Sequence, residues 1–147
     1  MIFAMLAVGE GLDQSGAVAM IVTAVAPWLE GLGPFALILA VYLIGLILTE
    51  FLSNNAVAVL YTPVAIKLAE NLALDPRPFA VAVMFSATLA FATPVGYQTN
   101  MMVYGPGGYR FTDYVRIGLP LNILIMLVVS LLIPLLWPLT PVLPQVN

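Results

Sequence analysis

The chain has 147 residues, of which 63% are apolar and only 7% are charged, and its mean hydropathy is +1.10. Soluble domains carry roughly 25% charged residues, so this composition excludes an ordinary soluble domain and predicts an integral membrane protein. The net charge of −3 comes from only four basic and seven acidic residues and says little about partners, and nothing in the sequence suggests that the chain binds nucleic acid. Because the chain has no cysteine, it carries no information on redox compartment or thiolate metal sites.

Residues 1–33 are predicted to hold the end of a preceding helix and an interfacial segment. Met1–Val8 is apolar and runs into a polar turn punctuated by glycine. Ala17–Leu29 is apolar for 13 residues, which is too short to span a bilayer comfortably. Pro27 and Trp28 near its end are typical of an interfacial anchor.

Residues 34–72 are predicted to form a helical hairpin. The stretch Thr49–Asn55 places five polar residues, Glu50 among them, between two apolar runs. A carboxylate at the bilayer centre costs about 2.5–3.5 kcal/mol, and such groups normally face a bundle interior or a wet cavity. Each arm reaches about 20–27 Å at 1.5 Å per residue, against a hydrocarbon core of ~30 Å. A hairpin that enters and leaves on one side fits as well as a full crossing.

Residues 67–78 read as a loop, because they carry charges and the pair Pro76 and Pro78. The following run, 79–109, has 31 residues without a charge and is predicted to be a broken helix. Pro94 and Gly96 favour the break, and the residues up to Asn100 supply polar groups there.

Residues 114–138 are predicted to form the final transmembrane helix, with Trp137 at the interface. Two basic residues fall in each of the two main loops, so the positive-inside rule does not orient the chain.

The two interruptions, at 49–55 and 94–100, are the basis for a functional prediction. Irregular backbone at membrane depth is tolerated only where it lines a cavity or is buried in protein, so both should face one site. The helix that begins after Asn55 would offer its N-terminus to an anion, and freed carbonyls would bind a coupling cation. Glu50 stays ambiguous, since a structural partner explains it as well as proton or cation coupling does.

Both interruptions resemble the C-terminal half of the divalent anion/sodium symporter family, a citrate-transporter-like family of the ion-transporter superfamily. The segments that carry the resemblance are Leu48–Ala56, which reads LTEFLSNNA, and Phe91–Gly107, which reads FATPVGYQTNMMVYGPG. The second segment is most similar to a sodium/sulfate symporter-like branch whose full-length members add potassium-transport-type regulatory domains.

The resemblance implies an all-α polytopic membrane protein: the second inverted repeat of an elevator-type transporter, with a re-entrant hairpin and a discontinuous transmembrane helix. It also implies a bacterial-type inner membrane, a homodimer, a separate N-terminal repeat, and transport without enzymatic catalysis. We therefore expect residues 1–147 to be one half of a transport domain that does not transport alone.

Site residues follow from the resemblance position by position. Those implied to bind substrate are Ser53, Asn54, Asn55, Tyr97, Gln98 and Thr99. Those implied to hold sodium, chiefly through the backbone, are Thr49, Leu52, Asn54, Gly96 and Gln98. The sequence departs from the family at Asn55, which replaces a threonine, and at 97–99, where many dicarboxylate carriers read Thr-Pro-Pro. A smaller divalent anion such as sulfate therefore joins di- and tricarboxylates as a candidate substrate.

Two alternatives stay open. One is a proton-coupled or pump-associated oxyanion carrier on the same fold, with Glu50 as the titrating group. The other is a non-transporting fragment or small membrane subunit that packs against a partner.

Overall fold

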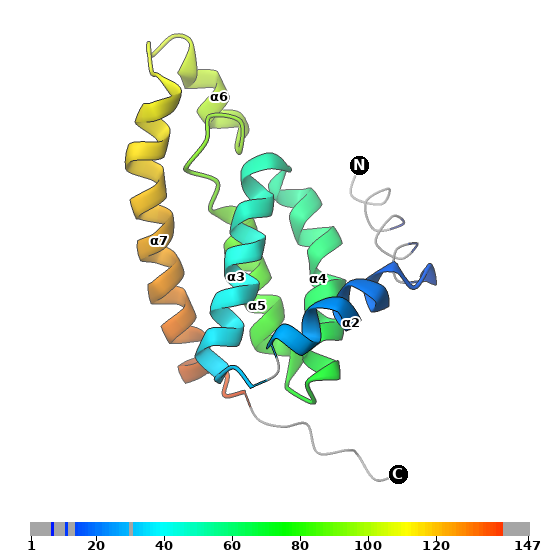
Figure 1. Cartoon of the computed structure of the whole chain (residues 1–147). Helices are drawn as coiled ribbons and strands as arrows, with labels where there is room; N and C mark the ends of the chain where they lie inside the picture. Colours follow the sequence, from blue (N-terminus) through cyan, green and yellow to red (C-terminus); the bar gives the residue numbers. More distant parts are fainter. Residues whose placement is uncertain (1–6, 8–10, 12–13, 30, 140–147) are drawn as a thin grey trace.

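The described part of the computed structural model is helical, without strands, and covers the chain except residues 1–6, 8–10, 12–13, 30 and 140–147. The predicted helix end at Met1–Val8 therefore lies largely outside the described residues. Figure 1 shows α3 and α5 between α4 on one side of the bundle and α7 on the other.

Helices α3 (Pro34–Phe51) and α4 (Asn54–Asn71) form a hairpin joined through Leu52 and Ser53. Pro34 lies in the first turn of α3, where its missing N–H costs nothing. Ser53 caps α4, because its hydroxyl accepts a hydrogen bond from Ala56 N at 3.3 Å. The polar stretch of the sequence is thus split between the end of one helix and the start of the next.

The loop predicted at 67–78 is much shorter in the structure. Helix α4 continues through Lys67 and Glu70, which form an exposed ion pair at 3.7 Å. Helix α5 (Pro76–Thr88) already begins at Pro76, after Asp75 accepts a hydrogen bond from Arg77 N at 2.9 Å. Proline cannot continue a helix from the preceding turn, but it is favourable at the first position of a new one. The two prolines therefore start a helix here and do not extend the loop.

The broken helix consists of α5, a non-helical segment at 89–97, and the short helix α6 (Gln98–Tyr104). The helix stops at Thr88, before the predicted break at Pro94. Gln98, Thr99 and Asn100 form the first turn of α6, so the non-helical segment ends at Tyr97, and the predicted end of the interruption at Asn100 is wrong. The interruption of the broken helix thus runs from residue 89 to residue 97, whereas Pro94 and Gly96 had indicated residues 94–100.

Helix α7 (Phe111–Leu136) is, among the described helices, the one both long and apolar enough to cross a membrane by the usual criteria. Its 26 residues correspond to about 39 Å, more than the ~30 Å hydrocarbon core. Helix α3 is apolar but shorter. Many large apolar side chains along α7 are exposed, as in a helix that meets lipid or further protein.

Helix α2 (Ala17–Leu29) is half-buried. Val18 and Val22 are buried in the core and Met20 is exposed, and α2 packs mainly on α4. The core itself is built mostly on α3, α4 and α5, and it includes Tyr42, Tyr61 and Phe79. Gly45 of α3 lies against Ser86 of α5 so closely that an added Cβ would overlap the Ser86 hydroxyl. Small residues at a contact between membrane helices allow such close approach.

Candidate functional site

A cavity of about 630 Å³ lies between the hairpin tip and the break in the broken helix. Its volume is in the range of sites for small molecules. Its lining comes from the tip, the start of α4, the C-terminal half of α5 and the approach to α6. The lining residues are Phe51, Leu52, Ser53, Asn54, Asn55, Ala58, Thr62, Met84, Ala87, Thr88, Val95, Gly96, Tyr97 and Gln98.

The structure brings most of the predicted site residues to this cavity. Seven of them line it directly: Leu52, Ser53, Asn54, Asn55, Gly96, Tyr97 and Gln98. The two interruptions, which are more than forty residues apart in sequence, thus meet in space as expected from their shared need for a polar environment.

Thr49 and Thr99 do not line the cavity. Thr49 is fully buried, and its hydroxyl donates to Ala87 O at 2.8 Å and lies 3.0 Å from Asn54 Oδ1. It thereby links the hairpin tip to the end of α5. Thr99 is exposed on α6.

Asn100 does not line this cavity either. Its side-chain amide donates to Ala90 O at 2.9 Å and to Thr93 O at 3.1 Å. Because the break leaves these carbonyls without helical partners, Asn100 supplies the hydrogen bonds that the broken helix lost. Its role in the structure is to hold the shape of the unwound segment.

Glu50 lies on the last turn of α3 and is 8% exposed. Its Oε1 accepts hydrogen bonds from Ala92 N and from Asn122 Nδ2, both at 2.9 Å. Glu50 is therefore buried and hydrogen-bonded, as expected of a carboxylate that faces a bundle interior. Its backbone oxygen accepts from the Thr93 hydroxyl at 3.2 Å, and that hydroxyl accepts from Gly96 N at 3.0 Å. Glu50 thus connects the hairpin to the backbone of the break.

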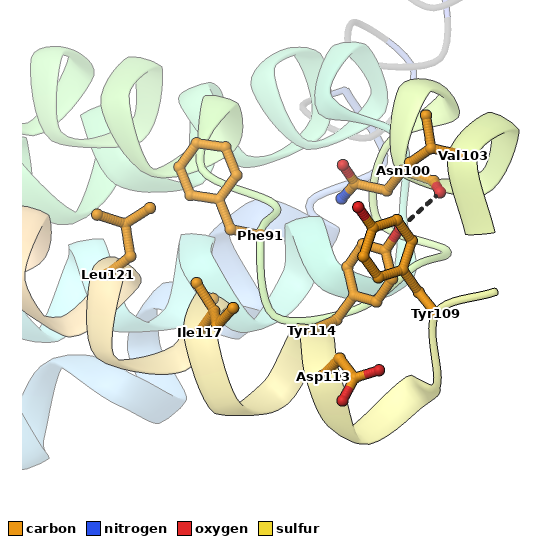
Figure 2. Close-up of a pocket in the computed structure, with 9 residues that line it drawn as sticks. Phe91, Asn100, Val103, Tyr109, Asp113, Tyr114, Ile117 and Leu121 are labelled. Atoms are coloured by element: carbon orange, nitrogen blue, oxygen red, sulfur yellow. Dashed lines mark hydrogen bonds between the residues drawn. The ribbon is translucent and has the colours of Figure 1, made fainter. Parts of the chain in front are cut away.

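Helix α7 contacts the break through residues that the sequence reading did not single out. The Tyr114 hydroxyl donates to Asn100 O at 3.0 Å, and Gly118 lies against the backbone of Phe91 and Ala92. Figure 2 shows the Tyr114 contact with Asn100 as a dashed line. Tyr114, Gly118 and Asn122 recur every four residues, which places them on one face of the helix. In the sequence, the feature that could have identified this face is Asn122, a polar residue four positions after Gly118 in a mostly apolar run without charges.

A second cavity of about 310 Å³ lies between the start of the break at Phe91, α6 and α7 (Figure 2). Most of its lining is apolar or aromatic, including Phe91, Ile117 and Leu121. Its one charged lining residue among those described, Asp113, accepts a hydrogen bond from Arg110 N at 2.7 Å. The Asp113 carboxylate therefore caps the N-terminus of α7.

The family model described as "Citrate transporter" matches residues 1–145. An uncharacterised transporter of Synechocystis is 44% identical over 93% of this chain and 22% of its own length. Sodium/sulfate cotransporter 1 of Chlamydomonas reinhardtii is 31% identical over 90% of this chain and 15% of its own length. A sodium-dependent dicarboxylate transporter of Staphylococcus saprophyticus is 30% identical over 90% of this chain and 25% of its own length.

The chain thus spans about a quarter or less of each of these relatives. The relatives are transporters, and the family match extends over almost all of the 147 residues. Together with the apolar composition and the hairpin and broken helix described above, this confirms the resemblance that the two motifs carry. The chain belongs to the citrate transporter family of membrane transport proteins.

Proposed function

We propose that this chain is the second inverted repeat of an elevator-type symporter that moves a small divalent anion together with sodium. It would supply one half of the transport site, with the other half coming from an N-terminal repeat in a dimeric, inner-membrane protein. The observation that carries the proposal is the cavity at which the hairpin tip and the break meet.

The electrostatics of this cavity favour coupled binding. None of its described lining residues is charged, so no lysine or arginine there can neutralise a dianion. The N-terminus of α4 begins at the tip and contributes about half a positive charge and free N–H groups. A sodium ion held by backbone carbonyls near Leu52 and Gly96 would offset further negative charge, which gives a physical reason for coupling.

The substrate class follows from the same features and from two relatives. Polar amides and a hydroxyl at Ser53, Asn54, Asn55 and Gln98 suit a small oxyanion or carboxylate. The names of the Chlamydomonas and Staphylococcus relatives specify sulfate and dicarboxylate, each with sodium. We infer that the substrate is sulfate or a di- or tricarboxylate.

Asn54→Ala tests the site in the full-length transporter that carries this segment. Asn54 lines the cavity and also lies beside Thr49, so its loss should weaken sodium and anion dependence together. Removing a hydrogen bond to a charged group costs about 1.5–3 kcal/mol, or roughly 10- to 100-fold in half-saturation concentration. Sodium and anion titrations of radiolabelled uptake in vesicles measure both.

Asn71→Ala is the matched control, because it is the same substitution on an exposed residue at the far end of α4. It should leave both half-saturation concentrations unchanged. If Asn54→Ala matched this control, the assignment of the site would be wrong.

The 147-residue chain reconstituted alone in liposomes should show no saturable, sodium-driven uptake of sulfate or dicarboxylate. Transporters of this architecture enclose the midplane site between two repeats. The full-length transporter serves as the positive control. Uptake by the chain alone, without evidence that it completes the site by dimerising, would contradict the proposal.

A further inference from the structure

Three residues of α7 contact the break or the hairpin without lining the cavity. Tyr114 donates to Asn100 O, Gly118 packs on Phe91 and Ala92, and Asn122 donates to Glu50. Because they are spaced by four residues, one rigid helix face meets three points of the hairpin and break. The geometry of the unwound segment is thus tied to the position of α7.

The Asn122 contact is the one that reaches the hairpin. Asn122 is 2% exposed, and its amide shares Glu50 Oε1 with Ala92 N. The carboxylate therefore joins the end of α3, the backbone of the break and the middle of α7. Among the described residues, Glu50 Oε2 and Asn122 Oδ1 are buried without a hydrogen-bond partner. The Asn122 amide and Ala92 N are accordingly the two groups that orient the carboxylate.

The position of this carboxylate bears directly on Gly96, which lines the cavity. A Cβ placed on Gly96 would lie 3.1 Å from Glu50 Oε2 and 2.8 Å from Ala90 Cβ, so the backbone there is closely confined. A second connection runs from the Glu50 carbonyl through the Thr93 hydroxyl to Gly96 N. The Glu50 carboxylate thus lies next to the backbone of Gly96, and the Glu50 main chain is linked to Gly96 N as well.

We propose that Asn122 is a positioning residue for the anion- and sodium-binding cavity. It does not line that cavity and acts through Glu50 and Gly96 on its shape. This inference rests on the proposed function for its transport readout, and the distance measurement below is independent of it.

Asn122→Leu removes the amide while keeping a side chain of similar shape. In the full-length transporter we expect the half-saturation concentrations for sodium and anion each to rise about tenfold, as when a hydrogen bond to a charged group is lost. Maximal uptake per molecule in the membrane should change much less. A purely structural role would lower the amount of protein or its thermal stability and leave both half-saturation concentrations as they were.

Ser130→Ala is the matched control. Ser130 is a buried polar residue two turns further along the same face of α7, and its hydroxyl has no hydrogen-bond partner among the described residues. It should leave the sodium and anion titrations unchanged.

A swapped pair tests whether Asn122 acts through Glu50. Asn122→Asp alone sets two carboxylates against each other and should raise the half-saturation concentrations at least as much as leucine does. Glu50→Gln combined with Asn122→Asp restores one carboxylate and one amide at the same two positions. We expect the double variant to regain most of the sodium and anion affinity lost in Asn122→Asp, since the effects of substitutions at two residues in direct contact are not additive. Additive effects would contradict the inference.

The distance measurement uses the 147-residue chain, whose lack of cysteine allows specific labelling. Spin labels are attached at Phe51→Cys at the end of α3 and at Val95→Cys in the break, both exposed and both lining the cavity. Pulsed electron paramagnetic resonance then reports the distance between the hairpin tip and the break. Asn122→Leu should shift or broaden the distance distribution, and Ser130→Ala should not. An unchanged distribution in Asn122→Leu overturns the positioning role, whereas absent sodium-dependent uptake by the unmodified full-length transporter overturns only the proposed function.

Discussion

Replacing Glu50 with alanine is expected to lower the free energy of unfolding by about 2–6 kcal/mol. The substitution leaves two buried donors, Ala92 N and Asn122 Nδ2, without an acceptor, and each such group costs about 1–3 kcal/mol. Glu50→Gln keeps an oxygen that can accept both hydrogen bonds and should cost less than half as much. Denaturant unfolding of the chain in mixed micelles measures the differences.

Glu70→Ala is the matched control for Glu50→Ala. It removes the same side chain at the exposed end of α4, where the ion pair with Lys67 spans 3.7 Å. Exposed pairs contribute about 0–1 kcal/mol, so the effect should be near zero. Equal losses at Glu50 and Glu70 would show that the hydrogen bonds of the buried carboxylate contribute nothing.

Glu50→Gln also separates sodium coupling from the proton-coupled alternative. In the full-length transporter, a folded Glu50→Gln protein that keeps its pH profile and sodium dependence would support a structural carboxylate. Loss of the pH profile with the fold intact would favour proton coupling, and the sodium proposal would have to be given up.

Gly118→Ala is expected to destabilise the protein by about 1–3 kcal/mol, the usual cost of adding a methyl group to a packed interior. The added Cβ would overlap the Phe91 carbonyl and lie 2.8 Å from Ala92 Cα, so backbone must move. Because that backbone belongs to the break, we also expect weaker sodium and anion binding in the full-length transporter. Thermal unfolding and uptake titrations measure the two effects.

Gly105→Ala provides the control for the glycine substitution. Gly105 has φ −71, and nothing lies within 4 Å of an added Cβ. The substitution should change stability by less than about 0.5 kcal/mol, as for surface positions in general. An equal loss for both variants would mean that the contact between α7 and the break is unimportant.

Local patterns in the sequence predicted the hairpin and the existence of a second interruption. The polar stretch at 49–55 could not continue an apolar membrane helix, and Pro94 with Gly96 could not either. The limits of the elements were less predictable. Pro76 starts a helix where it was expected to extend a loop, and the break begins at Leu89, which carries no local signal for it.

By itself the sequence indicated the class of the protein and seven of the residues that line the cavity. Apolar composition requires a membrane protein, and backbone groups freed at two interruptions require a shared polar cavity because lipid offers no hydrogen bonds. Only the tertiary structure decided the contacts of Glu50, Asn100 and α7. Asn122 and Glu50, for example, are 72 residues apart, and no local pattern specifies which buried donor a carboxylate will meet. That pairing arises when helices pack, because each buried polar group must then find its partner among whatever the neighbouring helix presents.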